Sequence, residues 1–188
     1  MSKASLFAVV FVFALAFTGR ASDITYDVDL TVGAGSVSGF IETDGTTTGP
    51  LSDSDIVSWN LLLNNSVTTF DLTPSNSAID IEGSDVTATA TQLFFNFGAS
   101  DNGNFIIEYP YVGSDATFVC FESSLDCTYT PAGISLAIGN HLPEGAQQIT
   151  AYSTNAVIGT AVPEPSSVMV LSALLAAALV ARRQIARG

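Results

Sequence analysis

Residues 24–31 read Ile-Thr-Tyr-Asp-Val-Asp-Leu-Thr, a strict alternation of apolar and polar side chains. Successive side chains of a β-strand point to opposite faces, so this period of two predicts a strand with one buried and one solvent-facing side. Gly33 and Gly35 follow, and residues 37–41 form a second short run with β propensity. Glycines between two such runs are typical of a hairpin turn. The body of the chain is therefore predicted to open with an antiparallel pair of strands.

The same kind of pattern recurs along the chain. Further strands are expected at residues 56–63, 67–72, 78–81, 86–97, 105–109, 117–121, 134–138 and 148–152. Turn-forming pairs such as Asp44-Gly45, Glu82-Gly83 and Asn102-Gly103 separate them. Many short strands with turns between them predict an all-β fold, a single antiparallel β-sandwich of jelly-roll or Greek-key type. The sequence does not choose between these two strand orders.

The N-terminus has the layout of a secretory signal peptide. A lysine precedes an apolar run at residues 6–17, and the small residues Gly19 and Ala21 follow. Cleavage is expected after Ala21, with Ala14 and Ala16 as an alternative site. Twelve apolar residues are too few for a stable membrane anchor, which needs about 20. The sequence therefore predicts export, with a signal helix at residues 1–21.

A short motif opens the C-terminal tail, in which Val162, Pro163, Glu164 and Pro165 follow one another. Each proline ring fixes its φ angle, and Pro165 also keeps Glu164 out of the helical region. The Pro-Glu-Pro tripeptide is therefore predicted to be extended and exposed. A processing enzyme can grip a segment of this kind.

The rest of the tail predicts a short transmembrane helix. Residues 168–180 form an apolar run of 13 residues that only Ser172 interrupts. A full crossing takes about 20 residues, so the helix needs its small flanks, some tilt or local thinning of the bilayer. Arg182, Arg183 and Arg187 are expected to hold the C-terminus on the cytoplasmic side of the inner membrane, which places the body outside.

The order of a Val-Pro-Glu-Pro motif, a short apolar helix and an arginine pair at the C-terminus resembles the PEP-CTERM sorting signal of exported bacterial proteins. The resemblance implies recognition by an exosortase, a membrane-embedded enzyme similar to cysteine transpeptidases. Such an enzyme would cut near Pro163–Pro165 and release the body or transfer it to the cell surface. These helices often carry glycines, whereas this one has alanines. An uncut membrane anchor with the same topology is the alternative.

Three regions follow from these patterns: the signal peptide (1–21), the β-sandwich body (22–161) and the sorting tail (162–188). The chain has a formal net charge of −13, but all five basic residues lie in its two ends. The segment 23–167 carries all 18 acidic residues and no lysine or arginine, which gives it a charge near −18. Such a surface cannot neutralise phosphates, so nucleic acid is excluded as a partner.

The two cysteines, Cys120 and Cys127, are expected to form a disulfide, the usual state of an even cysteine count in an exported chain. Closing this small loop would stabilise the fold by roughly 2 to 3 kcal/mol in the chain-entropy model. A metal site built from cysteine and histidine would need more ligands than these two cysteines and the single histidine, His141, supply. No resident cofactor is expected.

Catalytic patterns are missing from the sequence. His141 is the one candidate general base of the histidine type, and no serine elbow accompanies it. Asp53 with Asp55, and Asp27 with Asp29, offer oxygen ligands for calcium, but neither pair matches a known calcium loop. The three threonines within residues 86–91 are expected on one face of a solvent-exposed strand.

The sequence thus predicts a non-catalytic body with a structural or adhesive role at the cell surface or in the extracellular matrix, with exopolysaccharide as a further possible partner. The alternative is a carbohydrate- or calcium-binding module similar to a lectin. Aromatic side chains exposed near Tyr109 and Tyr111 would favour this alternative, and their burial would favour a structural body.

Overall fold

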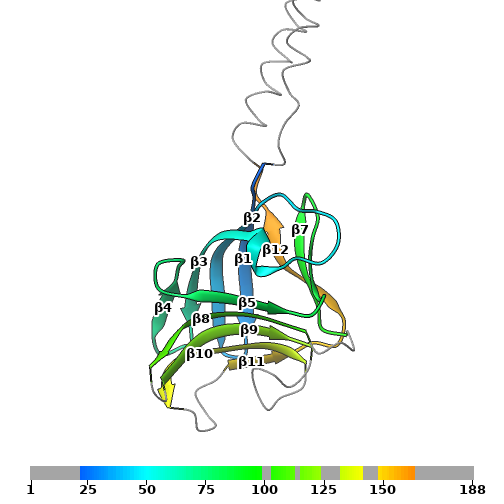
Figure 1. The fold of residues 1–188 in the computed structure, drawn as a ribbon. Helices are drawn as coiled ribbons and strands as arrows, with labels where there is room; N and C mark the ends of the chain where they lie inside the picture. Colours follow the sequence, from blue (N-terminus) through cyan, green and yellow to red (C-terminus); the bar gives the residue numbers. More distant parts are fainter. Residues whose placement is uncertain (1–21, 99–102, 113–114, 124–131, 142–147, 164–188) are drawn as a thin grey trace, which may run out of the picture.

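The computed structural model describes residues 22–98, 103–112, 115–123, 132–141 and 148–163 (Figure 1). These residues form β-strands in two antiparallel sheets and one short 3-10 helix, η1 (Asp53–Asp55). The predicted all-β class and antiparallel pairing are confirmed. The predicted signal helix, and the tail beyond Pro163 with its predicted transmembrane helix, lie outside the described residues. Within the described ranges, no helix has the length and apolar character needed to cross a membrane.

The larger sheet has seven strands. Their order across the sheet is β4 (Thr69–Leu72), β3 (Ile56–Asn64), β2 (Gly35–Thr43), β1 (Ile24–Val32), β12 (Asn155–Ala161), β7 (Gln92–Asn96) and β6 (Val86–Ala88). The smaller sheet has five strands in the order β11 (Gln148–Ala151), β10 (Gly133–His141), β9 (Asp115–Glu122), β8 (Asn104–Val112) and β5 (Ala78–Glu82). The chain passes between the sheets after β4, β5, β7 and β11, so each sheet is assembled from distant segments.

The predicted opening hairpin is present. β1 pairs with β2 over its whole length, from Ile24 opposite Thr43 to Val32 opposite Gly35. Tyr26, Val28 and Val32 are buried and Leu30 packs partly buried against the core, while Asp27, Asp29 and Thr31 are exposed. The alternation read from the sequence therefore assigns the faces of β1 correctly, because the strand has one side on the core and one in water.

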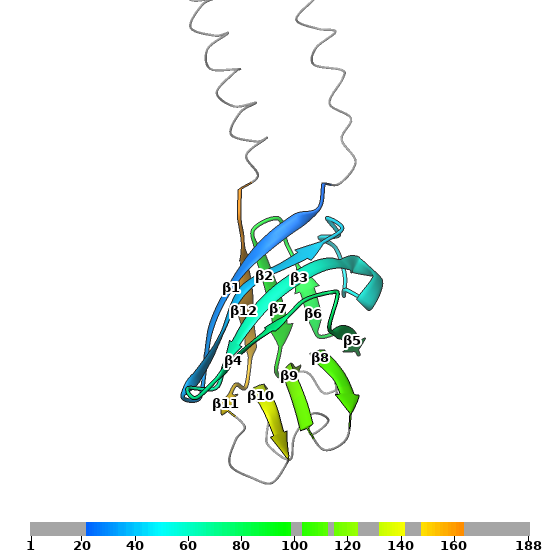
Figure 2. The ribbon, with the colours of Figure 1, turned by 90° about the vertical axis from the view of Figure 1, so that its left-hand side faces the viewer.

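The two sheets cover a common core and make a sandwich-like body. In Figure 1 the strands of the smaller sheet run across the direction of β1, β2 and β3, and Figure 2 shows the two layers from the side. The ring of Phe121 on β9 connects the layers, because its centroid lies 5.4 Å from that of Phe105 and 6.1 Å from that of Phe95 on β7. These three rings are fully buried.

One predicted strand is wrong. Residues 86–97 were expected to form one strand, but they form β6 and β7 with a tight turn between them. Thr89 makes this turn: its N–H donates to the Gln92 carbonyl at 2.8 Å, and its Oγ1 accepts from the Gln92 N–H at 3.0 Å. Threonine hydroxyls can bond to nearby backbone in this way and compete with strand pairing. The expected row of three threonines on one strand face is therefore absent, since Thr89 and Thr91 lie in the turn.

The last strand, β12, was not predicted. Its burial pattern does not alternate, because Ile158 and Gly159 are both buried where the pairing with β7 shifts register between Val157 and Gly159. A bulge of this kind adds a residue to one strand and breaks the period of two. β12 is nevertheless a central strand of the larger sheet, and it leads directly into the tail.

The outer face of the smaller sheet carries a second, small apolar cluster. Phe118, Cys120 and Ala137 are buried there, and Ile106 packs against them. No free cysteine occurs among the described residues, but Cys127 lies outside them. The bridge between Cys120 and Cys127 therefore stays a prediction.

Candidate functional site

The strongest candidate site is the end of the body where β12 runs into the sorting motif. β12 lies between β1 and β7, and its antiparallel pairing sets Ala161 opposite Tyr26 and Thr160 opposite Asp27. Antiparallel neighbours place the start of one strand beside the end of the other. Figures 1 and 2 accordingly show the start of β1 and the end of β12 at the same end of the body.

Backbone hydrogen bonds hold the chain up to the first proline of the motif. The Ala161 N–H donates to the Thr91 carbonyl, and the Val162 N–H donates to the Thr25 carbonyl, both at 2.8 Å. Pro163 has no N–H and cannot continue such a ladder. The folded sheet therefore ends at Val162, and the Pro-Glu-Pro segment begins at the next residue without a linker.

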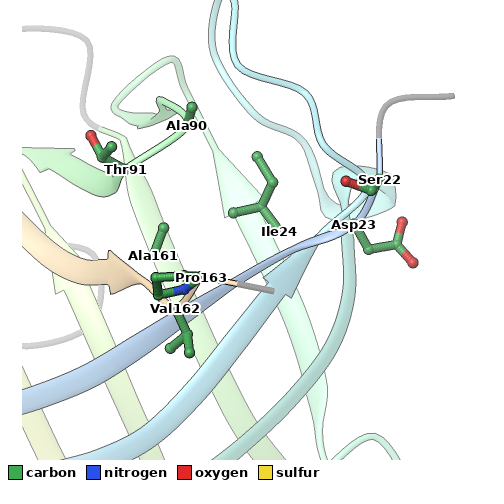
Figure 3. A pocket seen from close by; sticks show the side chains of 8 residues that line it. All are labelled: Ser22, Asp23, Ile24, Ala90, Thr91, Ala161, Val162 and Pro163. Atoms are coloured by element: carbon green, nitrogen blue, oxygen red, sulfur yellow. The ribbon is translucent and has the colours of Figure 1, made fainter. Parts of the chain in front are cut away.

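A pocket of about 380 Å³ lies beside this junction. Three separate segments build it: the start of the body, the β6–β7 turn and the end of β12 (Figure 3). Its lining residues are Ser22, Asp23, Ile24, Ala90, Thr91, Ala161, Val162 and Pro163. The lining is mostly small or apolar, with one carboxylate (Asp23) and two hydroxyls (Ser22 and Thr91), so it offers a surface for contact. Sequence reasoning found Val162 and Pro163 but not the other six residues.

Tyr26 anchors the β6–β7 turn, which forms one side of the pocket. Its ring is fully buried, and its hydroxyl donates to the Thr89 carbonyl at 2.6 Å. Gly159 on β12 makes room for it, because a Cβ at that position would lie 2.9 Å from the Tyr26 Cβ. Burial raises the pKa of the Tyr26 phenol above its ordinary value of 10.0, because the charged phenolate loses hydration.

We expect Tyr26→Phe to lower the free energy of unfolding by about 1 kcal/mol at pH 8, the usual net value of one hydrogen bond. The variant should also lose less stability above pH 10. In the parent protein the folded state keeps the phenol protonated where the unfolded chain ionises. The stability that the protonated phenol contributes is fully present below the pKa that Tyr26 has in the unfolded chain, and it is lost as pH rises through the pKa that Tyr26 has in the folded protein. Urea unfolding of the purified protein on both sides of pH 10 measures both effects.

Tyr109→Phe is the matched control, because the Tyr109 ring is 42% exposed and packs at the molecular surface. It should leave the unfolding free energy at pH 8 nearly unchanged. Equal stability of Tyr26→Phe and the parent protein, together with the same loss above pH 10, would contradict the role assigned to Tyr26.

Two of the four carboxylates named above as possible calcium ligands accept hydrogen bonds from the backbone. Asp53 Oδ1 accepts from the Ile81 N–H at 2.7 Å, and Asp55 Oδ2 accepts from the Ser52 N–H at 2.7 Å. Asp27 and Asp29 lie exposed on β1. Throughout the described part of the chain, no group of three or more histidine, cysteine or acidic side chains could hold a metal ion.

Two further sequence candidates are only partly described. Tyr109 is partly exposed and makes an edge-to-face contact with Phe70, with ring centroids 5.4 Å apart, whereas the side chain of Tyr111 lies outside the description. His141 is the last residue of β10, and its side chain is likewise not described. The expected aromatic surface therefore consists of a single side chain among the described residues.

The fold and this junction define a class of protein: an all-β body whose final central strand continues into a short C-terminal motif. A family model described as the PEP-CTERM protein-sorting motif matches residues 161–184. The chain thus carries a PEP-CTERM sorting motif, as the sequence resemblance predicted, and this motif marks an exported protein that is sorted by an exosortase. The match includes Val162 through Pro165 and the Arg182-Arg183 pair. No curated protein and no solved structure matches the chain.

Proposed function

We propose that this protein is a surface or matrix component whose non-catalytic body has a structural or adhesive role, and that an exosortase processes it at the Pro-Glu-Pro segment. The observation that carries the proposal is the position of the motif. The matched segment 161–184 begins at the last residue of β12, a strand paired on both sides within the larger sheet. A cut near Pro165 therefore separates the complete folded body from the tail.

The charge and the composition of the junction support a non-catalytic body. The segment 23–167 has no lysine or arginine and carries all 18 acidic residues, a composition that favours solubility outside the cell. Among the described residues two carboxylates are buried, those of Asp85 and Glu122, and both are engaged within the fold. The lining of the pocket at the junction is mostly small or apolar and includes no histidine, cysteine or lysine.

The second candidate is a carbohydrate- or calcium-binding module similar to a lectin. Its support is the partly exposed ring of Tyr109, which Phe70 holds in an edge-to-face contact. Aromatic rings bind sugars through their apolar faces, but one ring provides a small platform. This candidate therefore stands second.

Glu164→Ala tests the proposed processing. Intact-mass spectrometry of protein from the host cell surface and medium should show a parent chain that ends near Pro165. In the variant, a chain that still contains Arg182 and Arg183 should accumulate. Loss of a contact to a charged group costs about 1.5–3 kcal/mol, which corresponds to about a 10- to 160-fold slower cut.

Glu108→Ala is the matched control, because Glu108 is exposed on β8, far along the chain from the motif. It should be processed like the parent protein. A parent protein that retains both arginines on the cell surface would show an uncut anchor and overturn the proposed processing.

A further inference from the structure

The residues that adjoin the two predicted processing sites of this chain lie at one place on the body. Ser22 is the residue next to the predicted signal-peptide cut, and Pro163 is the first proline of the sorting motif. Both line the same pocket, although 141 positions separate them in the sequence. The pairing of β1 with β12 produces this proximity.

An enzyme that binds the sorting motif must also cover this end of the body. Extended chain advances at most about 3.3–3.6 Å per residue, so the three residues of the Pro-Glu-Pro segment can span at most about 11 Å. The Val162 N–H is hydrogen-bonded to the Thr25 carbonyl, so Val162 does not lengthen the segment that can extend from the body. The rim next to Pro163 consists of Ser22, Asp23, Ile24, Ala90 and Thr91, which we call the junction surface.

The junction surface has small, exposed side chains that leave room for an enzyme to approach closely. Ala90 and Thr91 are exposed, small and uncharged, and the half-exposed Val162 adds an apolar side chain. Before the signal peptide is removed, however, the chain continues from Ser22, a residue of the junction surface, back into the signal peptide. Hydrolysis of the peptide bond between Ala21 and Ser22 consumes one water and leaves a carboxylate on Ala21 and an amine on Ser22.

We propose that the processing enzyme docks on the junction surface while it binds the sorting motif, and that the signal peptide has to be removed before the enzyme can dock. This inference rests on the proposed function, and it adds a binding surface on the body and an order for the two cuts. The tail by itself is then an incomplete substrate: the folded end of the body contributes to recognition.

Ala90→Arg tests the docking surface in the full chain expressed in its host. A long charged side chain on this exposed turn should slow tail processing at least about tenfold, since small displacements of a bound substrate cost rates of that order. The amount of uncut chain over time, followed by intact mass, measures the effect. Val67→Arg is the matched control, because Val67 is 87% exposed in the turn after β3, beside the far end of β1.

A second set of variants tests the order of the cuts. Gly19→Leu combined with Ala21→Leu removes the small residues that a signal peptidase needs. The retained signal peptide should slow the cut in the tail at least about tenfold. A flexible glycine-serine linker of about ten residues between Ala161 and Val162, which spans about 17 Å, should restore the cut in this variant and in Ala90→Arg.

The outcomes separate this inference from the proposed function. If the parent protein is never cut, the proposed processing fails. If the parent protein is cut, and Ala90→Arg and the chain with retained signal peptide are cut equally fast, the docking inference fails while the processing stands. Slow cutting in both variants, normal cutting of Val67→Arg and rescue by the linker would establish the junction surface.

Discussion

Gly39→Ala is expected to destabilise the body by at least about 3 kcal/mol, a large part of the roughly 5–15 kcal/mol that holds a domain of this kind together. Gly39 lies in β2 between Val28 on β1 and Leu61 on β3. Its φ angle is +133°, which side chains of L-residues rarely adopt. A Cβ there would also overlap the backbone carbonyl oxygen of Asn60. The variant must therefore distort the central strands of the larger sheet.

Gly49→Ala separates the clash from the backbone preference. Gly49 also has a positive φ, +80°, but no atom lies within 4 Å of a Cβ at that position. It should cost about 1–2 kcal/mol, the usual penalty of a left-handed conformation. Urea unfolding followed through Trp59, the one tryptophan of the chain, measures both variants. Equal losses for the two variants would contradict the steric role of Gly39.

Phe121→Ala is expected to cost about 3–5 kcal/mol, as truncation of a buried aromatic ring usually does. The ring of Phe121 is stacked on that of Phe105 and lies across the core from Phe95. Its removal leaves a cavity where the two sheets meet, and the strands can fill it only by shifting toward each other. The midpoint of thermal unfolding should fall accordingly.

Phe70→Ala provides the same chemical change at a different place. Phe70 lies on the edge strand β4, is only partly buried and contacts the partly exposed ring of Tyr109. Its loss should cost less than half as much, because solvent can fill the space. A Phe121→Ala variant as stable as Phe70→Ala would show that the two layers do not depend on the aromatic contact between them.

Local patterns predicted the elements that repeat with a simple period. β1 was predicted because its side chains alternate strictly, and its hairpin partner because glycines follow at the turn. The failures have local causes too. Thr89 bends the chain through its hydroxyl where the composition looked like a continuous strand, and the bulge at Val157 and Gly159 hides the period of β12.

Only the contiguous part of the candidate site could be predicted from the sequence. Val162 through Pro165 form a contiguous motif, so the sorting function is visible without a structure, and the family match confirms the motif. The junction surface is discontinuous, because Ser22 and Ala90 reach Pro163 only through strand pairing. Ala90 carries no chemical signal of its own, and Ser22 is marked in the sequence only by its place after the predicted signal-peptide cut.

The all-β class, the acidic body and the sorting motif could be predicted without a structure, since each depends on composition or on neighbouring residues. The tertiary structure decided that β12 lies between β1 and β7, and therefore that both ends of the body meet at one pocket. Alternation shows which face of a strand is buried but not which strand lies beside it. Every residue except proline offers the same backbone donor and acceptor, so only the packing of the whole sandwich-like body selects the partners.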